Sequence, residues 1–508
     1  MERLYVKLKE YSASDYYPFH MPGHKRNPLI TGADLPYEID ITEIDGFDDL
    51  HHASSILKEA EERAARAYRA EETHYLINGS TAGILSAVLG CSERGRKILI
   101  ARNCHKSVYN AVYLNELHPV YVYPEFDERT GLNGEIRPEK VARILKSEQD
   151  ICAVVITSPT YDGVVSDVRM ISDIAHEKGI PLIVDEAHGA HFGFHPYFPG
   201  NSNQAGADVV IHSLHKTLPS LTQTALLHIN GGLADRRRIR KYLHLLQTSS
   251  PSYILMAGMD ECIRAVSGRN DVWTAYTESL ERTRKELGRL KYLRLLKTER
   301  YDRSKLVISA KGTLLKRADG SRKEFTGREL YRLLLERYHL QMEMAAGSYI
   351  IAMTGPGDTN EGLQRLVSAL VEIDKALSAA EGQAGEEAEE NRTEAVQARE
   401  NGFEKYTGEE NCSAGVSGKL QQQEQVLSAW DAEQLKYSGE KTRTVAWADA
   451  GGKVSLEYAY LYPPGIPLVV PGERIGKETA RQMTEYQKMG FSIEGTEESG
   501  KIEVWING

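Results

Sequence analysis

The sequence predicts an α/β protein organised around a largely parallel sheet, on the strength of three observations. Seven short apolar segments recur between positions 73 and 229, most are separated by segments with helical apolar spacing, and several end abruptly in polar residues. Strands that alternate with helices form a parallel sheet covered on both faces. Because ligands of such sheets bind at the carboxyl ends of strands, the residues after each strand are the functional candidates. The expected strands are 73–77, 97–101, 120–123, 153–157, 181–184, 209–211 and 225–229.

The most informative strand ends lie in the segments 180–188 and 208–217. Each segment contains a run of Val and Ile typical of a buried parallel strand. The first run is followed by Asp185 and the second by Lys216. A carboxylate and an amine at neighbouring strand ends fit a plain salt bridge as well as a catalytic pair, so this pair alone decides nothing.

The composition is that of an ordinary soluble protein. The chain has 508 residues, of which 41% are hydrophobic and 26% charged, and this length predicts two or three domains. Its apolar runs fall short of the roughly 18 residues of a membrane helix, and its first residues lack a signal-peptide core. We therefore expect a cytoplasmic protein with no membrane partner. The five cysteines have no paired spacing, which suggests neither disulfides nor a metal site.

The net charge of −10 is concentrated in one segment. Between positions 381 and 410 there are ten acidic residues and three basic ones, so the rest of the chain is close to neutral. The sequence has no basic patch interleaved with aromatic residues, and we expect no nucleic-acid partner. Residues 378–424 are poor in apolar and aromatic residues, which predicts an acidic, disordered insert or linker with some helix near 386–400.

Two further strand ends carry polar residues. The turn at 78–83 contains Ser80 and Thr81 and opens a helix, whose free N–H groups and dipole favour a phosphate. Such a turn is also ordinary capping chemistry. His105 follows the second strand, where by itself it is more often a structural histidine.

Taken together, these residue types suit pyridoxal 5′-phosphate (PLP), an aromatic phosphorylated aldehyde. Lys216 would form a Schiff base with the aldehyde, for which its amine must be neutral. Asp185 would keep the pyridine nitrogen protonated, so that the ring accepts electrons from a bond broken at the substrate α-carbon. His105 would stack on the ring. The phosphate would be held by Ser80, Thr81 and Ser213, with His188 and His215 near the aldehyde or the phosphate.

Several motifs together closely resemble the Orn/Lys/Arg decarboxylase family of PLP enzymes. The resemblance covers about 17–258 as the major domain and resumes at 462–473, which looks like the family's C-terminal domain. The core motifs begin within the first 25 residues, so the chain resembles the short Gram-positive form, which lacks the N-terminal wing domain. The motifs are His-Met-Pro-Gly-His-Lys at 20–25, Asn-Gly-Ser-Thr at 78–81, Cys-His-Lys-Ser at 104–107, Asp-Glu-Ala-His-Gly-Ala-His at 185–191, Ser-Leu-His-Lys-Thr at 213–217 and Tyr-Pro-Pro-Gly-Ile-Pro-Leu at 462–468.

The resemblance implies a PLP-dependent transferase-like major domain of aminotransferase fold type I, with a mostly parallel seven-stranded sheet and smaller α/β C-terminal domains. It gives Lys216, Asp185 and His105 the roles above, and it places His215 on the phosphate side. Thr222 matches a family position that reaches the phosphate of the neighbouring subunit, which implies a homodimer with active sites at the interface. The acidic stretch 40–49 resembles a family interface segment. Within it Glu43 and Asp45 are candidates for reading the distal cation of a substrate, and a structural role is equally open.

The domain boundaries follow changes in the sequence pattern. We expect an N-terminal arm and interface segment at 1–50, a PLP-binding major domain at 51–260 and a small α/β domain at 261–377. The insert at 378–424 and a C-terminal α/β domain at 425–508 complete the chain. Glu343, in the small domain, is a further candidate for the distal cation, although an ordinary polar strand residue is the simpler interpretation.

The expected reaction is α-decarboxylation of arginine, lysine or ornithine to agmatine, cadaverine or putrescine, as in polyamine metabolism. Lys216 and His215 are candidates for the group that returns a proton to the α-carbon. Transamination or another PLP reaction on the same scaffold is the first alternative, and a catalytically inactive relative that binds PLP or partners is the second. The sequence does not choose among the three amino acids, because the residues that read the distal group lie in loops.

Overall fold

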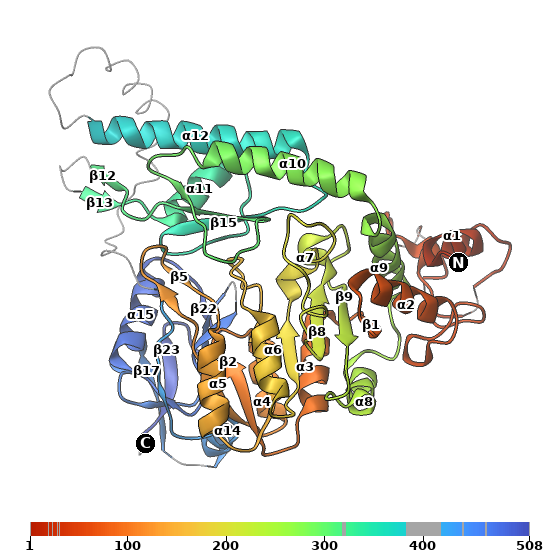
Figure 1. Ribbon diagram of the computed structural model, residues 1–508, viewed down its shortest axis with the longest axis horizontal. Coiled ribbons are helices and arrows are strands. Elements are labelled where there is room, and N and C mark those ends of the chain that lie inside the picture. Colours follow the sequence, from red (N-terminus) through yellow and green to blue (C-terminus); the bar gives the residue numbers. More distant parts are fainter. Residues whose placement is uncertain are drawn as a thin grey trace. The chain divides into compact units, whose positions relative to one another are not determined.

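The computed structural model describes residues 2–506 apart from positions 19, 23, 28, 30, 317–321, 383–417, 439–440 and 463–464. The chain forms two compact units (Figure 1). Unit 1 consists of Met1–Val122, Ile136–Thr160 and Val165–Trp273, and unit 2 of Tyr123–Glu135, Tyr161–Val164 and Thr274–Gly508. The five-part division expected from the sequence is finer than this and stays a prediction. No helix in the described part of the chain is both long and apolar enough to cross a membrane.

Unit 1 is built on a seven-stranded sheet with the order β1-β9-β8-β7-β6-β2-β3. Figure 1 labels β1, β9, β8 and β2 of this sheet. Strand β9 is antiparallel to β1 and β8, and the other neighbouring pairs are parallel. The predicted mostly parallel seven-stranded sheet is therefore confirmed, and six strands end at the same edge. The strands are β1 (Glu72–Leu76), β2 (Lys97–Ala101), β3 (His118–Val122), β6 (Ile151–Thr157), β7 (Leu182–Asp185), β8 (Val209–Ser213) and β9 (Ala225–Ile229).

Helix α3 (Gly79–Cys91) packs closely on its neighbours because Gly83 and Gly90 have no Cβ atom. A Cβ atom on Gly83 would lie 2.6 Å from Leu76 Cδ1 of β1, and one on Gly90 would lie 2.5 Å from Ile239 Cγ1 of α8. Real side chains do not tolerate such distances, so these glycines fix α3 between the sheet and α8 (Arg236–Leu246). The other helices of unit 1 are α1 (Leu4–Ser12), α2 (Ile56–Tyr68), α4 (Lys106–Leu114), α5 (Pro138–Ser147), α6 (Val168–His176), α7 (Leu214–Thr217) and α9 (Tyr253–Val266).

From the sequence, Ser54 or Ser55 is the expected N-cap of the helix whose apolar pattern starts at Ile56, but the structure caps α2 in another way. Ser55 occupies the N-cap position but its side chain makes no capping hydrogen bond. Instead the Asp48 carboxylate accepts hydrogen bonds from the backbone N–H groups of Ser54, Ser55 and Leu57 at 3.0, 2.8 and 3.1 Å. Burial opposes ionisation of Asp48, but these hydrogen bonds lower its pKa. Part of the acidic stretch 40–49 thus has a structural role.

Replacing Asp48 with alanine is expected to destabilise the start of α2 by about 1–2 kcal/mol, the usual cost of losing a helix cap. Hydrogen exchange at the amides of Ser54, Ser55 and Leu57 measures this loss locally, and their protection should fall about tenfold. Asp45→Asn is the matched control, because Asp45 is an exposed carboxylate of the same stretch. Equal loss of protection in both variants would contradict the capping role.

Unit 2 contains a four-stranded antiparallel sheet with the order β10-β11-β15-β14. The segments 275–293 and 326–338 have a helical pattern in the sequence, and they correspond to α10 (Asn270–Leu287) and α11 (Gly327–Tyr338). Helix α11 opens with a capping box of Thr326 and Glu329. A longer helix, α12 (Asn360–Gly382), follows. The strands are β10 (Arg294–Leu295), β11 (Lys305–Ser309), β14 (Met344–Ala345) and β15 (Tyr349–Met353), with short hairpins β4–β5 (Phe126–Asp127, Leu132–Asn133) and β12–β13 (Leu314–Lys316, Arg322–Glu324).

The C-terminal part of unit 2 has two sheets, of order β16-β21-β18-β23-β17 and β20-β19-β22. In the sequence, 454–461 and 493–505 each have the pattern of a single strand, but this prediction is wrong, because each segment leaves one sheet and joins the other. The elements are α14 (Ala429–Tyr437), α15 (Lys477–Lys488), β16 (Glu424–Gln425), β17 (Thr442–Ala446), β18 (Val454–Ser455), β19 (Ala459–Leu461), β20 (Ile466–Val469), β21 (Glu473–Arg474), β22 (Ile493–Glu494) and β23 (Lys501–Trp505). Their shared core includes Trp447, Val469, Ile475, Met483 and Ile502.

The two ends of the expected acidic insert at 378–424 need correction. Helix α12 continues to Gly382, and Glu424 already pairs with Arg474 in a sheet. Positions 383–417, including the helix expected near 386–400, lie outside the described residues, as do the two prolines at 463–464.

Candidate active site

Two neighbouring strands of unit 1 end in Asp185 and Ser213. Asp185 is the last residue of β7 and pairs with Ile211 of β8 in parallel register. The chain passes directly from Ser213 into the short helix α7, which carries His215 and Lys216. The fold therefore delivers a carboxylate, an amine, an imidazole and a hydroxyl group to one edge of the sheet.

Lys216 lies close to two of the other candidates. Its Nζ is 3.0 Å from Nε2 of His188, which belongs to the short turn η3 (Ala187–Gly189) after β7. Asp185 is 3% exposed, and Ala187 N–H donates to its Oδ1 at 3.1 Å. Burial raises the pKa of Asp185, while the charge of Lys216 lowers it. Lys216 thus helps a buried carboxyl group to stay ionised, and an ionised carboxylate binds a protonated ring nitrogen.

His105 is held at the start of α4 with its ring fixed. Its Nδ1 accepts hydrogen bonds from the Ser107 hydroxyl at 2.8 Å and from the Ser107 backbone N–H at 3.2 Å. Burial, followed by the charge of Lys216, lowers the pKa of His105 to about 4. The ring is therefore neutral at pH 7, which suits stacking on an aromatic ring. The sequence reasoning missed Ser107, although its spacing from His105 is that of an N-cap and its N2 partner.

The turn between β1 and α3 meets the end of β8. Gly79 begins α3 with a φ of +71°, and Ser80 Oγ lies 2.5 Å from Ser213 Oγ. Two hydroxyl groups and the first N–H groups of a helix thereby come together, a donor set that binds phosphate. Thr81 is exposed at the same helix start.

Beyond Lys216, the segment 214–224 contains His215 and Thr222. His215 donates from Nδ1 to the Thr224 carbonyl oxygen at 3.0 Å, and burial lowers its pKa. Nε2 of the neutral ring is then an acceptor, which orients the ring for proton transfer. Thr222 is exposed in the loop between α7 and β9. A role in an interface stays a prediction.

The three candidates for reading the distal cation of a substrate lie in different places. Glu43 and Asp45 are exposed in the loop that precedes Asp48. Glu343 belongs to unit 2, where it is exposed and its Oε1 accepts a hydrogen bond from the Tyr161 hydroxyl. The structure describes each residue within its own unit, and their part in substrate recognition stays a prediction.

Unit 2 also contains a cavity of about 230 Å³, and none of the predicted site residues lines it. Its lining includes Asp162, Lys311, Tyr349 and Tyr486. Burial raises the pKa of Asp162, while a hydrogen bond of 2.6 Å from the Tyr349 hydroxyl lowers it. Asp162 is thus paired with Tyr349 within this cavity.

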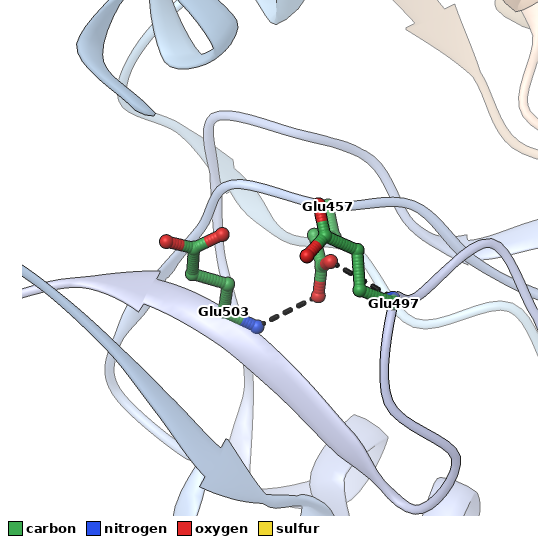
Figure 2. Close-up of side chains that lie close together, drawn as sticks. All are labelled: Glu457, Glu497 and Glu503. Carbon is green, nitrogen blue, oxygen red and sulfur yellow. Dashed lines mark hydrogen bonds between the residues drawn. The ribbon is translucent and has the colours of Figure 1, made fainter. Parts of the chain in front are cut away.

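Within the described residues, one group of carboxylates has the spacing of a metal site, formed by Glu457, Glu497 and Glu503 (Figure 2). Figure 2 shows Glu457 accepting from the backbone N–H groups of Glu497 and Glu503, at 3.0 and 2.8 Å. The Lys436 ammonium pairs with all three carboxylates, with its Nζ 2.6 Å from Glu497, 2.9 Å from Glu503 and 3.7 Å from Glu457. Lys436 thus offsets one of the three negative charges of this group, which we name the C-terminal carboxylate cluster.

Replacing Lys436 with methionine is expected to destabilise unit 2 by about 2 kcal/mol. This lies between the stability lost on breaking a surface ion pair and that lost on breaking a buried one. Partial burial favours the neutral forms, but the ion pairs raise the pKa of Lys436 and lower that of Glu503. In the wild type the Glu503 contribution is present above the unfolded pKa, near 4.3, and is lost as pH falls through the lower folded value. In the variant the crowded carboxylates repel one another, so its stability should increase on mild acidification instead.

Urea unfolding of both proteins between pH 4 and 8 measures this difference. Lys501→Met is the matched control, because Lys501 pairs with Glu498 at 2.7 Å on an exposed surface and should contribute less than about 1 kcal/mol. A Lys436 variant no less stable than the Lys501 variant at pH 7 would contradict the role of Lys436.

Sequence comparison identifies the family to which this chain belongs. The sequence model of the Orn/Lys/Arg decarboxylase major domain matches residues 3–312, and that of the C-terminal domain of the same family matches residues 417–495. The chain belongs to the Orn/Lys/Arg decarboxylase family. The recognition based on the motifs at 20–25, 78–81, 104–107, 185–191 and 213–217 is thereby confirmed, and the chain is a member of a family of amino-acid decarboxylases.

Relatives in this family differ in the substrate that their names give. The arginine decarboxylase of Bacillus subtilis (strain 168) is 29% identical over 98% of this chain and 96% of that protein. The constitutive lysine decarboxylase of Escherichia coli (strain K12) is 29% identical over 56% of this chain and 43% of that protein. Among solved structures, the Francisella novicida lysine decarboxylase LdcF has a TM-score of 0.78 at 19% identity and covers 99% of this chain and 80% of that chain. At this identity the structural similarity supports the fold, and the predicted fold class is confirmed.

Proposed function

We propose that this chain is a PLP-dependent decarboxylase that converts a basic amino acid to its amine, with CO2 as the second product. The observation that carries the proposal is the group of Lys216, Asp185 and His105, in which Lys216 affects the pKa of both other residues. Membership of the Orn/Lys/Arg decarboxylase family supports the reaction type.

The residues present fit PLP. Ser80, Ser213 and the first N–H groups of α3 would hold the phosphate, with Thr81 beside them. His105, neutral and fixed by Ser107, would lie on one face of the ring. Asp185 would face the ring nitrogen, and Lys216 would attach to the aldehyde. When bound, the cofactor supplies an electron-accepting ring next to the substrate α-carbon.

The side chains of the protein then hold or transfer protons at the ring nitrogen and at the substrate α-carbon. Asp185 keeps a proton on the ring nitrogen, because its burial makes an unpaired negative charge costly and a cationic partner favourable. His188 Nε2 accepts from the Lys216 amine, and this contact orients the amine for exchange with the amino group of the substrate. After CO2 leaves, Lys216 or His215 returns a proton to the α-carbon, because both lie on α7 at the edge of the site.

The substrate that we test first is arginine, since several relatives aligned over more than nine tenths of the chain are named arginine decarboxylases. Lysine and ornithine remain alternatives within the family. Glu43, Asp45 and Glu343 are the residues proposed to bind the distal cation of the substrate. We further propose a cytoplasmic homodimer in which the partner subunit's Thr222 contacts the phosphate, and a role in polyamine metabolism through agmatine, cadaverine or putrescine.

One assay tests this proposal. Purified protein with PLP is given arginine, lysine and ornithine separately, CO2 and the organic product are both measured, and Lys216→Ala serves as the blank. Amine and CO2 in equal amounts from one substrate support the proposal and identify the substrate. A keto acid without CO2 would establish transamination instead. The absence of any product, despite a PLP absorbance that depends on Lys216, would identify an inactive relative.

A further inference from the structure

A continuous chain of hydrogen bonds runs across four strands directly behind the end of β7. Glu186 Oε2 lies 2.6 Å from His212 Nε2, His212 Nδ1 lies 2.9 Å from His228 Nε2, and His228 Nδ1 lies 2.7 Å from Thr73 Oγ1. The four residues follow β7 or lie on β8, β9 and β1, and none is more than 4% exposed. Since Asp185 immediately precedes Glu186, this buried chain ends beside the proposed cofactor site.

The two imidazole rings are held in place by an aromatic neighbour. Tyr68, at the end of α2, stacks on His212 with ring centroids 4.6 Å apart and lies 4.8 Å from His228. Its hydroxyl group donates to the Ala190 carbonyl oxygen at 2.7 Å, so the phenol is itself fixed. The rings therefore keep their positions, and only the positions of the protons along the hydrogen-bond chain can change.

The Glu186 end of this hydrogen-bond chain is held by Ser202. Its backbone N–H donates to Glu186 Oε2 at 3.0 Å and its hydroxyl group donates to Oε1 at 2.7 Å. Burial raises the pKa of Glu186 to about 8, and the hydrogen bonds from Ser202 oppose this rise. Glu186 can therefore exist with or without its proton in the working pH range of most enzymes.

Both histidines are neutral, because burial lowers the pKa of His212 to about 3 and that of His228 well below its ordinary value. A neutral imidazole has one N–H donor and one acceptor nitrogen. Only two arrangements then satisfy every bond. With Glu186 ionised, the Thr73 hydroxyl donates to His228, His228 donates to His212, and His212 donates to the carboxylate. With Glu186 protonated, the order reverses, and both histidines change tautomer.

The charged and titratable groups around Glu186 come from every neighbouring element. They are Asp185 on β7, His212 on β8, His228 on β9, Tyr68 on α2 and His191 after η3. His191 lowers the pKa of Glu186, and an ionised Glu186 raises that of Asp185. Of these groups, Asp185 is the one proposed to contact the cofactor.

We infer that Glu186, His212 and His228 are positioning residues for the reaction. Their hydrogen-bond chain lets Glu186 gain or lose a proton without losing a hydrogen bond. The charge of Glu186 then sets how firmly Asp185 holds a proton on the ring nitrogen. This inference rests on the proposed function, in which Asp185 faces that nitrogen. No bond other than those to hydrogen changes, and the proton exchanges with solvent.

Glu186→Gln is the variant that separates charge from structure. A glutamine can accept from the Ser202 hydroxyl through its oxygen and donate to His212 through its amide, so it reproduces the reversed order of the histidine bonds with no charge, while the bond from the Ser202 backbone N–H is lost. Thr73→Val is the matched control, because it removes the hydroxyl at the far end of the chain and leaves the Glu186 carboxyl group in place.

Infrared spectroscopy tests the chain independently of catalysis. The carbonyl stretch of a protonated, buried carboxyl group should disappear between pH 6 and 10 in the wild type and in Thr73→Val, with a midpoint near pH 8. It should be missing in Glu186→Gln. A band that titrates unchanged in Glu186→Gln would overturn the inference.

The second measurement is the absorbance of bound PLP against pH. Removing one negative charge on the order of 10 Å away, at an effective dielectric constant of about 20, should lower the midpoint in Glu186→Gln by roughly one pH unit. Thr73→Val should leave it unchanged. Equal shifts in the two variants, or none in Glu186→Gln, would overturn the coupling to Asp185. A wild-type protein that binds no PLP would instead refute the proposed function, and the infrared titration would still decide whether the chain carries a proton.

Discussion

Replacing Lys216 with alanine is expected to lower turnover of the preferred amino acid by at least ~10⁴-fold, the loss typical of removing a group that bonds covalently during the reaction. The proposed covalent attachment of the cofactor would be lost, and Asp185 would lose the nearby charge that lowers its pKa. Amine release measures the activity, and the absorbance of the protein with PLP measures the attachment. Both should be absent in the variant.

Lys216→Arg distinguishes covalent chemistry from a simple ion pair. Arginine keeps a positive charge near Asp185 but does not attach to an aldehyde as lysine does. We expect Lys216→Arg to be as inactive as Lys216→Ala while remaining folded. Activity within tenfold of the wild type would show that Lys216 acts only through its charge, which is the salt-bridge alternative left open by the sequence.

Asp185→Asn is expected to lower kcat by roughly 10³-fold, with a smaller effect on KM, because it removes a charge directed at the reacting cofactor. An asparagine keeps the size of the side chain and can still accept a hydrogen bond from Ala187 N–H. It cannot provide the negative charge that keeps the ring nitrogen protonated. Steady-state kinetics with the preferred amino acid, at saturating PLP, measures the loss.

Asp208→Asn is a matched control for a buried carboxylate of the same sheet. Asp208 precedes β8, accepts from Leu182 N–H at 2.8 Å and pairs with His176, so it lies at the amino ends of the strands. We expect this variant to lose stability while kcat stays within a few-fold of the wild type. Equal losses of kcat in Asp185→Asn and Asp208→Asn would mean that Asp185 acts through the fold alone.

Much of unit 1 could be predicted because its signals are local. A buried parallel strand requires a continuous run of Val, Ile and Leu, and each run is complete within a few residues, as at 182–184 and 209–211. The residues that follow such runs, among them Asp185 and Lys216, could be singled out without knowing which strands are neighbours. Motif spacing then identified the family.

Other features depend on contacts that no local pattern encodes. The cap of α2 comes from Asp48, which precedes the serines at the helix start in the sequence. It reaches them through a backbone turn in which its own φ is +68°. The C-terminal segments 454–461 and 493–505 read as single strands, yet each is divided between two sheets. Lys436 meets Glu497 and Glu503 only after these sheets have formed.

The sequence by itself determined the kinds of residue at the strand ends, their order and hence the family. Only the tertiary structure decided which buried polar groups meet. Glu186, His212 and His228 form one chain because the register of β8 against β9 places Val210 opposite His228 and brings His212 beside it. Register is set by pairing between segments far apart in the chain, and a slip of one residue would move every side chain to the opposite face.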